Sequence, residues 1–424
     1  MTRFLFKGLL RDRNRSTFPI TIVLLGVAIS VLMYSFMLGV MDDALRSNAR
    51  LDTGHVKIMT RGFRDISRQL PNDLGLTGVD EMIESLEKEF PGMEWTPRIR
   101  FGGLLDIPDE QGETRSQGPT YGIAADLLGA GSMETELLNL ERALIQGHLP
   151  EAPGEILVSD EFAKNLDVGI GETATLISAT STGSMAIHNF TIAGTIRFGI
   201  GPLDRNTMIA DIADVRYALD MADGASEILG FFPNLVYDEE RAAEIARSFN
   251  AGTPDPEDDF TPVMVTLLEQ NGLGEYLGMA KERISIILFA FFFVMSLVLW
   301  NAGLMAGIRR YGEIGVRLAI GESKPHLYGS LIVESMLIGI CGSIIGTAIG
   351  LGISYYLQEV GWDISGMMKG TNMIMANVIR AKITAESYYI GFIPGLLATL
   401  LGSAISGTVV FRRRTARLFK ELEA

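Results

Sequence analysis

Four long apolar runs divide this chain of 424 residues into membrane-spanning and water-soluble segments. The runs cover residues 18–40, 284–308, 327–356 and 388–411. A helix of about 20 apolar residues is long enough to cross the hydrocarbon layer of a bilayer. We therefore expect an α-helical membrane protein with four transmembrane helices.

The segment between the first two runs, residues 41–283, is polar and has the mixed periodicity of an α+β domain. Apolar residues at helical spacing predict helices at 79–90, 160–166, 212–221 and 239–250, and a helix at 266–283 that continues into the second apolar run. Short apolar runs bounded by turn residues predict strands at 53–59, 95–101, 104–107, 120–123, 155–159, 173–177, 190–196, 206–210 and 235–237. We expect a large extracytoplasmic α+β domain of two lobes, the inner one inserted in the outer one.

Charge gives the expected orientation in the membrane. The net charge is −15, yet short basic clusters lie at residues 3–15, 309–324 and 412–420. Basic flanks of transmembrane helices stay in the cytoplasm, so four helices with both termini inside place all three clusters on one side. The remaining segments are then a cytoplasmic amphipathic flank at 1–17, the outer domain with helical stalks at 41–283, a cytoplasmic segment at 309–326, an outer connection at 357–387 and a basic tail at 412–424.

The cytoplasmic segment 309–326 predicts a short helix. Ile314 and Leu318 lie on one face of it, Glu313 and Arg317 lie on another, and Gly321 ends it. The wording of residues 313–323, EIGVRLAIGES, resembles the cytoplasmic segment of FtsX-like permeases of ABC transporters, a family with MacB-type and lipoprotein-releasing LolC- and LolE-type members.

Two stretches of the outer domain extend this resemblance. Residues 143–177, which include LIQGHLPEAPGEILVSDEFAKNLDVGIGETATLI, are similar to the MacB-like periplasmic core domain. The GHVKI wording at 54–58 resembles the lipoprotein-releasing branch. The resemblance therefore implies a MacB-like periplasmic core domain between the first two helices, in a protein of the bacterial inner membrane.

The resemblance also implies partners and a coupling helix. In such permeases the cytoplasmic helix docks into a separate ATPase, here through Gly312, Glu313, Ile314, Gly315, Val316, Arg317, Leu318 and Gly321. ATP and Mg would be used by that ATPase, in two copies, and this chain would bind no cofactor itself. A second permease chain, identical or paralogous, a lipoprotein or lipid cargo and a periplasmic acceptor complete the expected partners.

Two further sets of residues lie in the apolar runs. Gly342, Gly346 and Gly350 form a ladder at helical spacing, which lets two helices approach closely and predicts helix packing against a partner helix not identified by the sequence. A candidate cargo cleft is lined by Met33, Met37 and Val40 on the first helix and Ile287, Phe291 and Met295 on the second, although ordinary helix packing explains these residues nearly as well.

Catalytic signatures are absent from the sequence. It has no GxxxxGK[ST] phosphate loop, GxSxG, HExxH or CxxC motif, its one cysteine is Cys341, and its four histidines lack metal-ligand spacing. We expect a non-enzymatic membrane subunit with no metal site and no nucleic-acid partner. An FtsX-like signalling lever that controls a wall hydrolase, and a MacB-like export protein for peptides or drugs, remain alternatives to lipoprotein extraction.

The topology yields a testable prediction. In a Cys341→Ala background, cysteines at Asn165 and Ser226 should react with an impermeant thiol reagent added outside, and a cysteine at Thr415 should not, because the first two lie in the outer domain. Labelling of the residue 415 variant from outside would contradict the topology.

Overall fold

The computed structural model of the chain describes residues 13–252, 258–270, 272–308, 311–363 and 378–408. They form two compact units, each described here by itself. The helical unit comprises Met1–Asp42, Gly278–Trp362 and Ile379–Ala424, and the sheet unit comprises Asp43–Leu277 and Asp363–Val378.

The sheet unit contains a closed ring of six strands. They are β3 (Glu94–Pro108), β4 (Thr114–Ala125), β9 (Thr207–Asp211), β6 (Glu155–Ser159), β8 (Met185–Ile196) and β7 (Thr173–Ala179). Each pairs with the next, and β7 pairs back to β3, which closes a barrel. Alternate residues of β3, including Phe101, Leu105 and Ile107, are fully buried in its core, as expected of a strand with one face inward.

The first half of β3 leaves the barrel and carries an open sheet. There β3 pairs with β11 (Glu227–Phe231), which pairs with β1 (Val56–Thr60), which pairs with β12 (Pro262–Thr266). The barrel strands from β4 to β9 are thus inserted in sequence between β1 and β11. The long strand β3 is shared by both parts.

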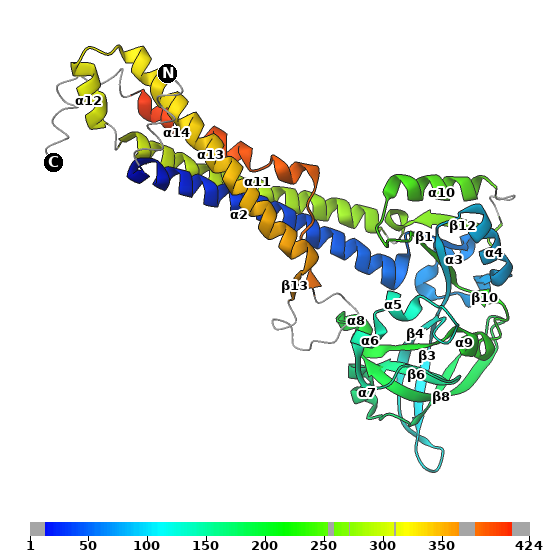
Figure 1. Cartoon of the computed structure of the whole chain (residues 1–424). Helices are drawn as coiled ribbons and strands as arrows, with labels where there is room; N and C mark the ends of the chain where they lie inside the picture. Colours follow the sequence, from blue (N-terminus) through cyan, green and yellow to red (C-terminus); the bar gives the residue numbers. More distant parts are fainter. Residues whose placement is uncertain (1–12, 253–257, 271, 309–310, 364–377, 409–424) are drawn as a thin grey trace. The chain divides into compact units, whose positions relative to one another are not determined.

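Helices and short strands complete the sheet unit (Figure 1). They are α3 (Arg61–Asp65), α4 (Val79–Glu89), α5 (Glu134–Leu137), α6 (Leu140–Ala143), α7 (Asp160–Leu166), α8 (Gly201–Asn206), α9 (Ile212–Ala218), α10 (Glu239–Ala251), β2 (Leu76–Thr77), β5 (Leu144–Gly147) and β10 (Gly224–Ala225). The side chain of Asn250, near the end of α10, exchanges two hydrogen bonds with the backbone of Met264 in β12, at 2.8 and 2.9 Å. This pair fixes α10 to the open sheet.

The structure corrects several sequence-based expectations for this unit. Residues 95–101 and 104–107 lie in the single strand β3. Residues 235–237 form no strand, since Leu235 has φ +51° in a turn, and the strand lies earlier, in β11. The helix expected from residue 266 begins at Leu273, because β12 extends to Thr266. Ser226 is fully buried, so Asn165, which is exposed, is the informative labelling position.

Among the described residues, three helices are long and apolar enough to cross a membrane. The spans are Thr17–Thr53 in α2 (Arg13–Asn48) and its extension, Leu273–Asn301 in α11 (Leu273–Ile308), and Lys324–Glu359, which is α13. The fourth apolar run forms a π-helical turn, Ile393–Leu397, followed by α14 (Ala398–Gly407). Its apolar helix Pro394–Gly407 is shorter than a full span, and residues 409–411 lie outside the described part, so a fourth crossing is not confirmed.

The glycine ladder packs against α2 of the same chain. A Cβ atom built at Gly346 would lie 2.6 Å from the carbonyl oxygen of Leu24 and 2.9 Å from the Cβ atom of Val27. Gly342 and Gly350 approach Val23 and Val31 in the same way, one helical turn to either side. The structure thus identifies α2 as the partner helix that the sequence left open.

We predict that Gly346→Ala destabilises the helical unit by about 1–3 kcal/mol, because the added methyl group has no space against α2. Gly352→Ala is the matched control on the same helix, since a Cβ there meets nothing within 4 Å. Thermal unfolding of the purified full-length chain in detergent measures both effects. Equal unfolding temperatures for the two variants would show that the ladder is not a tight contact.

Candidate functional site

Helix α2 ends in the sheet unit in a π-helical turn, Ala49–Thr53. The next residue, Gly54, has φ +60°, and its N–H group donates to the carbonyl oxygen of Ala49 at 2.8 Å. Glycine adopts a positive φ readily, because it lacks the Cβ atom that disfavours it. The last carbonyl groups of a helix have no partner within the helix and carry its negative dipole end, so they need donors from elsewhere.

Arg98 supplies donors to two of these carbonyl groups. Its guanidinium donates to the carbonyl oxygens of Leu51 and Arg50 at 2.8 and 2.9 Å. It also forms a two-pronged ion pair with Glu134, at 2.9 Å from Nε and 2.8 Å from Nη2. The side chains of both residues are fully buried. Paired, hydrogen-bonded geometry of this kind is what a buried charge requires.

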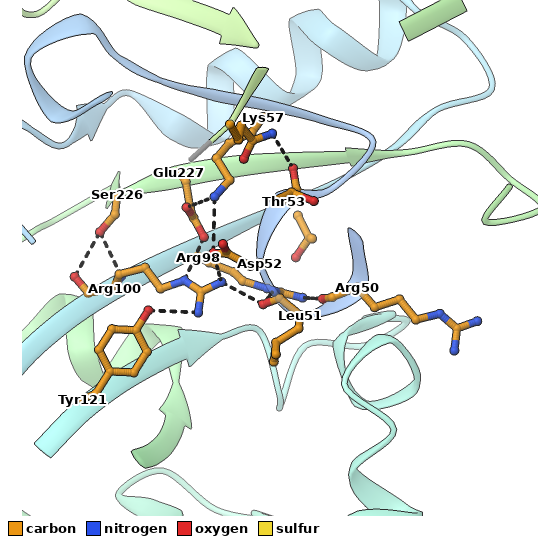
Figure 2. Close-up of polar contacts among 12 residues, drawn as sticks. Arg50, Leu51, Asp52, Thr53, Lys57, Arg98, Arg100, Tyr121, Ser226 and Glu227 are labelled. Atoms are coloured by element: carbon orange, nitrogen blue, oxygen red, sulfur yellow. Dashed lines mark hydrogen bonds and ion pairs between the residues drawn. The ribbon is translucent and has the colours of Figure 1, made fainter. Parts of the chain in front are cut away.

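Arg100 is two residues further along β3 and therefore on the same face of the strand. It donates to the carbonyl oxygen of Leu51 at 2.8 Å and to Glu227 at 2.9 Å. Lys57 on β1 approaches the other oxygen of Glu227 at 2.6 Å, and Asp52 at the end of the π-helical turn lies 3.2 Å from Arg100. Figure 2 shows these side chains converging on the turn at residues 50–53. We call Lys57, Arg98, Arg100, Glu134 and Glu227 the clamp.

Two of the clamp groups, Glu227 and Arg100, have pKa values shifted in favour of their charged forms. Burial by itself raises the pKa of Glu227, but the positive charges of Lys57 and Arg100 outweigh burial and bring the pKa below its ordinary value. Burial by itself lowers the pKa of Arg100, but Tyr121, Glu227 and Asp52 together raise it well above its ordinary value. Both groups therefore remain charged at neutral pH.

A further hydrogen bond holds the last residue of the turn. Gln270, which is buried just before α11, donates from Nε2 to the carbonyl oxygen of Thr53 at 3.0 Å. The segments that precede and follow the outer domain are thus joined within the sheet unit. This arrangement contains no nucleophile with an activating base among the described residues, and its geometry serves to hold the end of a helix.

A polar cavity of about 710 Å³ lies beside the clamp. Lys57, Arg100 and Glu227 reach it, and residues 63–70, from the end of α3 through a 3-10 turn, form much of its wall. These three charged groups are already paired with one another. These three residues therefore do not determine which charge a ligand in the cavity would need.

The structure places the predicted coupling residues in and just after helix α12 (Tyr311–Ala319). The helix ends as expected, with Gly321 at φ +100° donating to the carbonyl oxygen of Leu318. The side chains of residues 312–314 lie outside the described part, Gly315 is buried, and Val316 and Arg317 are exposed. Docking through this helix stays a prediction.

The predicted cleft residues lie on α2 and α11. They differ in exposure and in their contacts with the neighbouring helix. The side chain of Met295 packs on α2, where its Cε atom lies 3.4 Å from a Cβ atom built at Gly26. Ile287 is half exposed, and Phe291 is partly buried. Met33, Met37 and Val40 are also partly buried. The cargo cleft therefore stays a prediction, with helix packing as the observed role of Met295.

The sequence analysis did not predict the clamp. One signal was present, because TPRIRF at residues 96–101 puts Arg98 and Arg100 at alternate positions of an expected apolar strand. Such a pattern points to one face of a strand with buried positive charges that require acidic partners. The partners Glu134 and Glu227 are distant in sequence, and nothing near them singled them out.

Two family models match this chain over most of its length. The model of the MacB-like periplasmic core domain matches residues 20–245, and that of the FtsX-like permease C-terminal region matches residues 285–414. The chain belongs to the family of FtsX-like membrane permeases with a MacB-like periplasmic core domain. The MacB-like periplasmic core match covers most of its sheet unit, as the resemblance of residues 143–177 had indicated.

Individual relatives are distant. A lipoprotein-releasing system transmembrane protein LolC from Xylella fastidiosa strain Temecula1 is 25% identical over 272 residues, which are 62% of this chain and 61% of that protein. A macrolide export ATP-binding/permease protein MacB from Hyphomonas neptunium is 37% identical over 65 residues, 15% of this chain and 10% of that protein. The chain thus covers less than two thirds of either relative. The crystal structure of the periplasmic region of MacB from Actinobacillus actinomycetemcomitans aligns with 52% of this chain and 92% of its own, at 12% identity and a TM-score of 0.34.

The clamp leads to a prediction about stability. Arg98→Met leaves the carboxylate of Glu134 buried without its partner, which should cost about 3–5 kcal/mol of unfolding free energy. This corresponds to a fall of roughly 6–20 °C in the unfolding temperature of a unit of this size. Lys88→Met is the control, because its pair with Glu84 on α4 is exposed and 3.7 Å long. Thermal unfolding of the full-length chain should separate the two variants, and similar small shifts in both would contradict a stabilising clamp.

Proposed function

We propose that this chain is the permease subunit of an ABC transporter that couples ATP hydrolysis by a separate ATPase to the extraction or export of a lipoprotein or another amphiphile. The supporting observation is the held end of α2. One uninterrupted helix runs from Arg13 to Asn48, and donors from β3 hold the carbonyl groups that follow it. A helix with a firmly held end can transmit displacement along its axis, whereas a loose end would absorb it.

Helix α12 is the proposed point at which the ATPase acts. Val316 in α12 and Ile320 in the turn directly after it are exposed apolar side chains four residues apart, at 41% and 81% exposure, beside the exposed Arg317. Exposed apolar residues on a short helix suit an apolar groove on a partner protein. Two permease chains and two ATPase subunits, which use ATP and Mg, would make the working complex in the bacterial inner membrane, with both termini of the permease in the cytoplasm.

Lipoprotein extraction is the form of this function that we propose first, and the length of one match supports it. The similarity to the LolC relative extends over 62% of the chain, whereas that to the MacB relative from Hyphomonas neptunium covers 15%. The GHVKI wording at 54–58 supports the same branch. Macrolide-type export is the second candidate, because the shorter MacB match has the higher identity. An FtsX-like signalling lever would use the same mechanical parts without a cargo.

A docking test examines the proposal. Ile320→Asp and Val316→Asp should abolish the complex with the ATPase, or uncouple ATP hydrolysis from lipoprotein release, because a charge on this face opposes burial in the partner. Ile170→Asp is the matched control, since Ile170 is equally an exposed isoleucine but lies in the sheet unit. Co-purification of the ATPase and lipoprotein release from proteoliposomes are the measurements.

Unchanged binding and release in both α12 variants would remove the coupling assignment. Release of a macrolide but not of a lipoprotein by the unsubstituted complex would select the export alternative. ATP-dependent movement without release of either cargo would select the signalling lever.

A further inference from the structure

The segment at residues 380–387, between α13 and the fourth apolar run, lies against α2 within the helical unit. The N–H group of Lys382 donates to the carbonyl oxygen of Ser35 at 2.9 Å, and its ammonium group pairs with Asp42. The hydroxyl groups of Ser35 and Ser387 lie 3.1 Å apart, and both residues are fully buried. Contacts are thus spread over about two turns of α2, from residue 35 to residue 42.

Gly39 makes the closest of these approaches. A Cβ atom built there would lie 1.8 Å from the carbonyl oxygen of Arg380 and 2.8 Å from the Cα atom of Ala381. Both atoms belong to the backbone, so no side-chain rotation could relieve the overlap. The segment can occupy this position only because residue 39 has no side chain.

The same segment is also attached to the end of α13. The N–H group of Ile383 donates to the side-chain oxygen of Gln358 at 3.1 Å, and that of Ala381 is 3.4 Å from the carbonyl oxygen of Leu357. Ala381 itself is buried. The segment therefore bridges α2 and α13 at one end of both helices.

The glycine ladder joins the same two helices at a second place, between residues 342–350 of α13 and residues 20–31 of α2. Val27 on α2 lies within 3 Å of the Cβ positions of Gly346 on α13 and of Gly391 and Gly395 beside and within the π-helical turn before α14. Helix α11 is attached less extensively. In an apolar stretch of 18 residues of its membrane span, 11% of the residues are buried, against 39% in the corresponding stretches of α2 and α13.

We propose that residues 380–387 form a latch that fixes α2 to α13, so that α2, α13 and α14 move as one body and movement within the helical unit during a transport cycle takes place between this body and α11. This inference rests on the proposed function for its role in a cycle. The latch itself rests on the contacts of Ser35, Gly39 and Asp42, which do not depend on that function.

The first experiment tests the latch in the isolated full-length chain. Ser35→Cys and Ser387→Cys, in a Cys341→Ala background, should form a disulfide under mild oxidation, because two hydroxyl oxygens 3.1 Å apart need only a small adjustment to reach a sulfur–sulfur bond of about 2.05 Å. Adding Gly39→Leu should slow this reaction about ten-fold or more, because the side chain displaces the segment from α2. Gly352→Leu, a position with open space, should leave the rate unchanged.

The second experiment uses the complex with its ATPase. The oxidised Ser35→Cys/Ser387→Cys variant should keep the ATP hydrolysis and lipoprotein release of its reduced form, because the latch remains closed throughout the cycle. Loss of release on oxidation and its recovery on reduction would overturn the proposal, since α2 would then have to separate from the segment. Slow crosslinking that is insensitive to Gly39→Leu would overturn it as well.

The two experiments separate the latch from the proposed function. If the reduced variant and the unsubstituted chain both lack ATP-dependent release, the proposed function fails. The latch is then still judged by the crosslinking rates of the isolated chain.

Discussion

The fold of this permease depends on hydrogen-bond donors for the carbonyl groups at the end of α2. A helix that leaves a membrane and enters a soluble domain exposes its last carbonyl groups where no further helical turn can pair with them. Here Arg98 and Arg100, at alternate positions of β3, donate to the carbonyl groups of Arg50 and Leu51. Because β3 also belongs to both the barrel and the open sheet, the strand that holds the helix is the one that joins the two parts of the domain.

Burying charges to hold a helix costs desolvation free energy. Their use here has a mechanical consequence. An apolar contact could slide, since dispersion attraction has no fixed direction, whereas guanidinium groups bound to both carbonyl and carboxylate oxygens have few alternative arrangements. Replacing a buried ion pair by apolar residues is often neutral for stability, so the pair is better explained by the specificity of geometry that it confers. In the helical unit, close backbone contacts at Gly39 and Gly346 have a similar effect, because they leave no room for side chains to repack.

Sequence periodicity was sufficient to predict a helix or strand where a local pattern determines the structure. Strand β6 and helix α7 occur at the predicted residues, because β6 is a short apolar run and α7 has apolar residues at helical spacing. The short helix ending at Gly321 was also predicted from its pattern. Two neighbouring strands merged into β3, because Gly102 and Gly103 suggested a break but lie in continuous strand, where the absence of a Cβ atom on Gly103 allows the backbone of β7 to approach. The clamp required pairing between residues 98 and 134 and between 100 and 227, and single-sequence patterns carry no information on such distant contacts.

The central claim is that displacement of α2 reaches the outer domain through the clamp, and one measurement tests it most directly. Spin labels at Asn165→Cys in the two copies of a homodimeric complex, in a Cys341→Ala background, report the separation of the outer domains with and without ATP. In the double variant Arg98→Met/Glu134→Leu the buried charges are removed together, so the fold and ATP hydrolysis should be kept while the donors to the carbonyl groups of Arg50 and Leu51 from residue 98 are lost. The account predicts an ATP-dependent change in distance with the intact clamp and a much smaller change in the double variant at equal ATP hydrolysis. An undiminished change in the double variant would contradict it.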